Sequence, residues 1–142
     1  MKYDWSLFGI DKGSSVDESK ISQLQRTLGV TFPESYLDLV TYADEASPAI
    51  SSFSYGGEET CASEFFSFSS EVTPHSICWY IGPGRPPNLP KSMIPIARDA
   101  GGVLICLNFE TAHVAVEVFD PTSKKSHTAS NNFDNFINSW RQ

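Results

Sequence analysis

Residues 94–107 read IPIARDAGGVLICL and carry the strongest strand pattern of the chain. Residues 103–107 are apolar at every position, as expected of a central strand that is covered on both faces. Residues 93–97 are also apolar but include Pro95, which has no N–H for a sheet ladder and therefore favours an edge or a strand start. The connection over residues 99–102 is short, which predicts antiparallel pairing of the two strands in a meander.

Further strands are expected on both sides of this pair. Residues 114–119 alternate at period two, with valine at 114, 116 and 118, and predict the next strand of the meander. Residues 50–55, ended by Gly56-Gly57, and residues 65–68 predict two weaker strands. Residues 82–90 are rich in Gly and Pro and are interpreted as a stiff surface loop rather than a linker between domains.

Two helices are expected near the N-terminus, where they would form a helical hairpin. The first covers about residues 16–28, with Ser15 and Glu18 at capping-box spacing and Gly29 at the place of a left-handed C-terminal residue. The second covers about residues 32–43, with Thr31 and Glu34 at a second capping-box spacing. Its positions 36, 39, 40 and 43 are apolar and form one face, which predicts that this face is buried.

A short helical turn and a C-terminal helix complete the predicted elements. Thr73 and Pro74 resemble the N-cap and first residue of a turn that reaches Tyr80. An apolar stripe begins at Phe133 and continues at 136, 137 and 140, with an Asn or Ser cap among residues 130–132. This order predicts an α+β fold: a single domain over residues 1–142, whose N-terminal helical hairpin and C-terminal helix pack on an antiparallel-rich, mixed β-sheet.

The composition agrees with one ordinary folded domain. The chain has 142 residues, of which 40% are hydrophobic, 13% aromatic and 19% charged, and these values exclude a disordered chain. The longest apolar stretch is too short to cross a membrane, and the N-terminus lacks the apolar region of a signal peptide. We therefore expect a soluble, cytoplasmic protein. A monomer or a weak homodimer is expected, since open sheet edges could pair.

No motif indicates enzymatic chemistry. The sequence has no nucleophile elbow, no phosphate-binding loop and no zinc-protease motif. Its three cysteines, Cys61, Cys78 and Cys106, lack metal-binding spacing. The histidines are scattered, with His113 expected at the start of a strand and His127 in a polar turn. We therefore expect no enzyme activity, no cofactor and no bound metal.

The formal charge of −7 is concentrated in one part of the chain. Residues 27–84 contain eight acidic residues and no Lys or Arg, whereas the segments on either side are nearly balanced. Such a segment would repel nucleic acid and anionic membranes and would attract a basic protein. Two interpretations stay open at this point: an acidic binding face, or a solvated surface that only keeps the protein soluble.

Three motifs occur in order along the chain. They are LG at 28–29 followed by FPESY at 32–36, then IPIARDAGGVLICL at 94–107, and finally NFDNFI at 132–137. Together they resemble the SUKH superfamily of Smi/Knr-type domains over about residues 15–140. The sequence departs from that pattern in Phe32, where leucine usually precedes the proline, and in the missing Asn-Gly after the second helix. The resemblance implies the fold predicted above and a protein that binds other proteins.

The resemblance also implies an immunity function, because most bacterial members look like proteins that neutralise a cognate toxin, often a nuclease. A nuclease presents a cationic or metal-binding surface, which carboxylates can cover. We therefore expect a basic toxin domain as the partner, with no direct contact to nucleic acid or a membrane. The candidate interface residues are Asp44, Glu45, Glu58, Glu59 and Glu64, in the loops after the helical hairpin, and the aromatic anchors Tyr55, Trp79 and Tyr80.

Two alternatives accompany this hypothesis. Trp79 and Tyr80 could instead pack inward under the proline-rich loop, as aromatic side chains near a short helix commonly do. The protein as a whole could instead be a regulatory scaffold like the fungal members, with partners that are not toxic.

Overall fold

A five-stranded antiparallel meander forms the main sheet of the computed structural model, which describes residues 3–142. Met1 and Lys2 lie outside the described residues. Lys2 is one of the basic residues counted in the formal charge of the N-terminal segment. The strand order is β3-β4-β5-β6-β7. Their bounds are β3 (Glu64–Phe65), β4 (Met93–Arg98), β5 (Leu104–Asn108), β6 (Ala115–Asp120) and β7 (Lys125–Ser130).

The stretch at 94–107 supplies the centre of this sheet, as predicted. Strand β5 lies between β4 and β6, and Ile105, Cys106 and Leu107 are fully buried. Pro95 pairs with Cys106 of β5, while β3 pairs only with the last two residues of β4. The missing N–H of Pro95 is therefore not required by β3, and the register shifts just after it. Strand β4 is not the edge strand that Pro95 favours, since it lies between β3 and β5, but Pro95 has no Cα partner in β3.

A separate hairpin precedes the main sheet. It pairs β1 (Ser52–Tyr55) with β2 (Glu58–Cys61) through the turn at Gly56 and Gly57, whose φ angles are 52° and 83°. Positive φ at both turn residues gives the twist that a two-residue hairpin needs. The sequence predicted β1 but not β2, because β2 begins with two exposed glutamates rather than with alternating apolar residues.

Strand β7 was also missed. Its first four residues are exposed, so the apolar alternation that identifies a half-buried strand is absent. The expectation that His127 lies in a polar turn is wrong, since His127 pairs with Val118 in the β6–β7 ladder.

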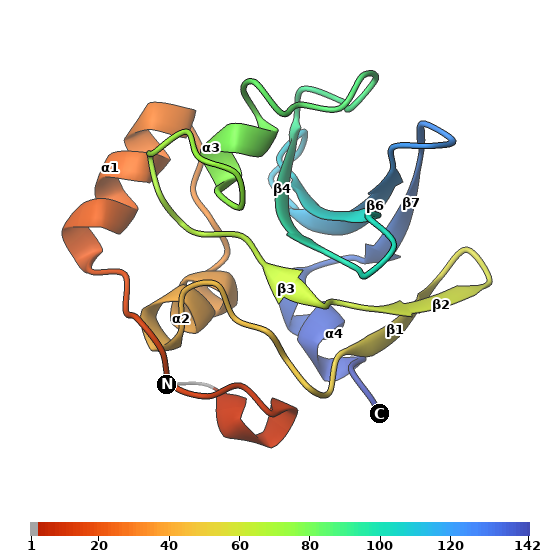
Figure 1. Ribbon diagram of the computed structural model, residues 1–142, viewed down its shortest axis with the longest axis horizontal. Helices are drawn as coiled ribbons and strands as arrows, with labels where there is room; N and C mark the ends of the chain where they lie inside the picture. The colour runs from red at the N-terminus through yellow and green to blue at the C-terminus, as the bar shows by residue number, and fades with distance from the viewer. Residues whose placement is uncertain (1–2) are drawn as a thin grey trace.

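Within residues 3–142, four helices and a short 3-10 helix, Trp5–Phe8, accompany these strands. The bounds of the four are α1 (Glu18–Leu28), α2 (Glu34–Tyr42), α3 (Ile77–Tyr80) and α4 (Phe133–Asn138). In Figure 1, α1 and α2 lie on one side of the molecule, and β4, β6 and β7 curve on the other. The β1–β2 hairpin extends away from α1 and α2, below β7 in that view. No helix within residues 3–142 is long and apolar enough to span a bilayer.

The N-terminal caps of α1 and α2 differ from those predicted. Helix α1 is capped by Asp17, whose Oδ1 accepts the Lys20 N–H at 2.9 Å, so the capping box at Ser15 is not formed. Asp17 lies nearer the helix start and supplies a stronger, charged acceptor. Helix α2 follows Pro33 with no side-chain cap, so the second predicted capping box is also absent. Gly29 has φ 68°, as expected of the residue that ends α1.

The remaining two caps give one correction and one confirmation. Helix α3 is capped by Ser76, not by Thr73, since Ser76 Oγ accepts the Trp79 N–H at 3.1 Å. Helix α4 is capped by Asn132, whose Oδ1 accepts the Asn135 N–H at 2.8 Å. This result selects asparagine from the predicted Asn or Ser caps.

Aromatic rings join the helices to the hairpin in the core. The Tyr36 ring of α2 lies 5.6 Å from the Phe133 ring of α4, measured between centroids. The next turn of α4 places Phe136 4.8 Å from Phe53 of β1 in an edge-to-face contact. The apolar faces predicted for both helices are therefore buried, and they meet each other through these rings.

Candidate functional site

The predicted interface residues come from several different elements of the fold. Asp44 follows α2, Glu64 lies in β3, and the hairpin carries Tyr55, Glu58 and Glu59. The other three are Glu45, Trp79 and Tyr80. Each group has different contacts, and these contacts decide which side chains a partner could use.

The Asp44 carboxylate makes hydrogen bonds within the fold. Its Oδ1 accepts the Phe68 N–H at 2.9 Å and its Oδ2 accepts the Ser67 hydroxyl at 3.1 Å. The half-buried carboxylate therefore ties the segment after α2 to the segment after β3. Glu45, the next residue, is exposed and has a left-handed φ of 56°. Its side chain makes no hydrogen bond or ion pair in the described part of the chain.

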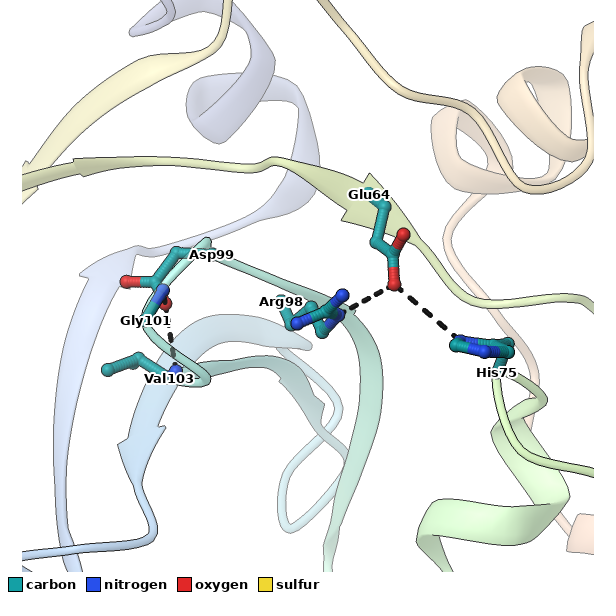
Figure 2. A network of polar contacts seen from close by, with 6 residues as sticks. All are labelled: Glu64, His75, Arg98, Asp99, Gly101 and Val103. Carbon is teal, nitrogen blue, oxygen red and sulfur yellow. Dashed lines mark hydrogen bonds and ion pairs between the residues drawn. The ribbon is translucent and has the colours of Figure 1, made fainter.

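Glu64 is paired within the sheet (Figure 2). Its Oε1 accepts a hydrogen bond from Arg98 Nε at 2.6 Å and lies 3.7 Å from His75 Nδ1. Glu64 and Arg98 are directly opposite each other in the β3–β4 ladder, which brings the two charges together. The hydrogen bond that Arg98 donates to Glu64 raises the pKa of Arg98. A partner would have to compete with this pair for the carboxylate.

Asp99 is the buried carboxylate next to this pair, and the sequence presented it only as part of the 94–107 motif. Its Oδ1 accepts the N–H groups of Gly101 and Val103 at 2.9 and 2.8 Å, which closes the β4–β5 turn (Figure 2). Its Oδ2 accepts the Thr60 hydroxyl at 2.8 Å and so holds β2 against the main sheet. An Asp closely followed by two glycines at a strand end is the sequence signal of such a turn.

The hairpin carries the carboxylates that remain accessible. Glu58 and Glu59 are both exposed and lie on β2, not in a loop as predicted. Glu59 Oε1 is 3.1 Å from Arg141 Nη2 on the surface, a pair that contributes little to stability. Glu58 has no hydrogen bond or ion pair from any side chain of residues 3–142. Tyr55 is directly opposite Glu58 across the turn and is half-buried.

A polar hollow of about 300 Å³ lies between the hairpin and the end of the main sheet. Tyr55 and Glu58 line its hairpin side, and Asp120 and His127 line its sheet side. The Tyr55 and His127 rings are 5.9 Å apart. Burial raises the pKa of Tyr55, and the carboxylates of Asp99, Glu58 and Asp120 raise it further. Sequence analysis missed Asp120 and His127, which are far from the hairpin along the chain.

Trp79 and Tyr80 pack as the second interpretation of them predicted. Tyr80 stacks on Phe66 with centroids 4.1 Å apart and an angle of 15° between the rings. The backbone of the proline-rich loop lies on Trp79, since a Cβ placed on Gly84 would overlap the indole ring at Nε1. Both rings are half-buried, so a partner could reach only their exposed edges.

Metal ligation has no geometric support in the part of the chain described. Among residues 3–142, no three His, Cys, Asp or Glu side chains are placed to hold an ion. Cys106 is fully buried in β5, and this burial raises the pKa of its thiol far above the usual range.

The fold defines a class of protein in which a helical pair precedes an antiparallel meander and a short aromatic helix follows it. The SUKH_6 family model, described as SMI1-KNR4 cell-wall, matches residues 18–137. The chain therefore belongs to the SMI1-KNR4 family of the SUKH superfamily. Comparison with curated proteins finds no match to it.

Proposed function

We propose that the chain is a non-catalytic immunity protein that binds a cognate toxin domain and blocks its activity. Family membership supports a binding domain, and the resemblance to bacterial immunity proteins supports a toxin as the bound partner. The observation that carries the proposal is the exposed acidic hairpin. Glu58 is unpaired within residues 3–142, and Glu59 has only a surface contact with Arg141.

The acidic interface of this proposal is smaller than the one predicted from sequence. Asp44 and Glu64 hold the fold together through short hydrogen bonds, so we assign them to structure. The interface then centres on the hairpin, with Glu45 as a separate exposed carboxylate. Tyr55 remains as an aromatic side chain beside the glutamates, where a half-buried ring can anchor a contact.

A basic toxin is the partner that this charge pattern fits. Toxins that cleave nucleic acid need cationic surfaces to hold phosphates, and carboxylates can occupy those surfaces. Opposite charges also speed association, to about 10⁸–10⁹ M⁻¹s⁻¹ at low salt, which matters when escaped toxin is lethal. The proposed mechanism is therefore occlusion of the toxin surface, with no bond made or broken.

Complex formation tests the proposal. The C-terminal domain encoded next to this gene would be purified in an inactive form and mixed with this chain. We expect a stable one-to-one complex on size-exclusion chromatography with light scattering. If the two proteins elute separately at micromolar concentration, or if the complex forms but the active toxin is not inhibited, immunity is contradicted. Binding to a neighbour that is harmless in cells would instead support a regulatory scaffold.

A further inference from the structure

We infer that the hollow between the hairpin and β6–β7 is a socket for an arginine side chain of the protein partner. The inference rests on the proposed function, because it names the kind of side chain that the acidic hairpin would bind. It adds Asp120 and His127, from the main sheet, to an interface otherwise centred on the hairpin.

The walls of the socket come from two separate sheets. Tyr55 and Glu58 are Cα partners on either side of the hairpin turn. Asp120 comes from the end of β6 and His127 from β7. A Cβ placed on Gly56 would lie 3.2 Å from His127 Nδ1, so the turn of the hairpin packs directly against β7 and closes one side. The socket therefore exists only because the hairpin is docked on the main sheet.

The carboxylates of the socket lack a cationic partner in this structure. Glu58 has no ion pair within residues 3–142, and the Asp120 carboxylate accepts only the Thr122 N–H, at 2.9 Å. Lys125 is the Cα partner of Asp120 in the β6–β7 ladder, but the structure over residues 3–142 contains no ion pair between them. Asp99 is close enough to Tyr55 to raise its pKa and adds a third negative charge. A cation entering the hollow would thus meet negative potential that no described side chain neutralises by direct contact.

The aromatic wall favours arginine among the cations. Tyr55 presents a half-buried ring whose hydroxyl is protonated at neutral pH, as for an ordinary tyrosine, and burial together with the surrounding carboxylates raises its pKa further. A guanidinium can stack on such a ring while its N–H groups donate to carboxylates at the ring edge. Glu58 and Asp120 lie on opposite walls of the hollow and can accept hydrogen bonds from different N–H groups of the same guanidinium. A volume of about 300 Å³ is ample for a guanidinium and its stem.

The probe for this inference is blocked arginine, N-acetyl-arginine methylamide, titrated into the full chain and followed by NMR. The matched probe is blocked citrulline, which has nearly the same shape without the charge. We expect saturable shifts confined to Tyr55, Glu58, Asp120 and His127 with arginine and not with citrulline. Equal shifts with both probes, or shifts that spread evenly over the surface without saturation, would overturn the inference.

Two double variants separate the socket from general acidity. Glu58→Gln with Asp120→Asn should weaken binding of blocked arginine by about tenfold, as expected when charged hydrogen bonds are lost. Glu71→Gln with Glu110→Gln removes the same charge from exposed positions outside the socket and should leave binding unchanged. Lys125→Ala removes the positive charge at the residue whose Cα is opposite that of Asp120 in the ladder, and it should strengthen binding. Equal losses in both double variants would contradict a socket.

The socket and the immunity proposal can fail separately. Saturable arginine binding without inhibition of any toxin would keep the socket and remove immunity. A tight toxin complex that the Glu58 and Asp120 variants leave unchanged, together with no arginine binding, would keep immunity and remove the socket.

Discussion

Asp99 shows how one side chain can hold two parts of this domain together. It is only 6% exposed, and its three accepted hydrogen bonds reach both the β4–β5 turn and Thr60 of the hairpin. The sequence located the turn, because Asp-Ala-Gly-Gly after an apolar strand is typical of one. It could not locate the bond to Thr60, since that contact depends on how the hairpin docks. The role of Asp99 in its own turn was therefore predictable from sequence, whereas its contact with the distant hairpin was not.

Asp99→Ala should lower the free energy of unfolding by about 2–4 kcal/mol, because it leaves buried N–H groups without an acceptor. Thr60→Val removes only the bond to the hairpin and should cost about 1 kcal/mol. Urea denaturation measures both values. Asp11→Ala, at an exposed position, is the control and should change little. A loss for Asp99→Ala no larger than that of the control would show that Asp99 does not join the turn to the hairpin.

Tyr36 should make the protein sensitive to alkaline pH. The ring is fully buried, its hydroxyl has no hydrogen-bond partner within residues 3–142, and burial raises its pKa well above the usual value near 10. A raised pKa in the folded state means that the stability is complete below pH 10 and falls as the pH rises above that value. Tyr36→Phe should therefore make this alkaline decline shallower, as measured by thermal unfolding between pH 8 and about 11.5.

The same variant carries a second expectation at neutral pH. Because Phe removes a buried hydroxyl without a partner, we expect stability at pH 7 to be unchanged or to rise by up to about 1 kcal/mol. A clear loss of stability would show that the Tyr36 hydroxyl does have a hydrogen-bond partner in solution, and the alkaline sensitivity would then need another source.

Element by element, prediction succeeded where the burial pattern is simple. Strand β5 and helix α4 have apolar residues at the positions that their periods require, and both were predicted. Strands β2 and β7 have exposed, polar sequences and were missed, because their positions depend on neighbouring strands. Helix caps were ambiguous for another reason: several Ser, Thr, Asp or Asn residues precede α1, α3 and α4, and only the path of the chain selects the one that caps each helix.

The cap of α4 can be tested by a matched pair of variants. Asn132→Ala removes the acceptor of the Asn135 N–H and should lower stability by about 1 kcal/mol. Asn131→Ala changes the same residue type one position earlier, where the side chain makes no hydrogen bond within residues 3–142, and should be nearly neutral. Chemical denaturation measures the free energy of unfolding of both variants. Equal losses of stability would show that the Asn132 side chain does not cap α4.

At the scale of the whole molecule, the sequence predicted an acidic region but not which of its carboxylates are exposed and free to bind a partner. The charge excess over residues 27–84 was readable directly. Asp44 and Glu64 proved to be engaged in the fold, whereas Glu58 and Glu59 are exposed on the hairpin. The link from the hairpin to Asp120 and His127 joins distant parts of the chain, and no local pattern could indicate it.

The hairpin glutamates should control how salt affects partner binding. Glu58→Lys with Glu59→Lys should slow association with the toxin domain and flatten its dependence on ionic strength, because the attractive potential at the interface is lost. Glu71→Lys with Glu110→Lys makes the same change in net charge at exposed positions elsewhere and should have a smaller effect. Stopped-flow rates at several salt concentrations compare the two. Identical slopes for both variants would show that only net charge matters.

The most direct test of the central claim is growth rescue. Cells would express the C-terminal domain encoded next to this gene, with the chain, without it, or with the Glu58→Lys/Glu59→Lys variant. If the chain is an immunity protein, the neighbouring domain is toxic alone and the wild-type chain abolishes this toxicity. The variant should allow at least part of the toxicity to return. Thermal unfolding of the purified variant checks that it is folded. Toxicity that persists in the presence of the folded wild-type chain, or a neighbouring domain that is harmless on its own, would contradict the claim.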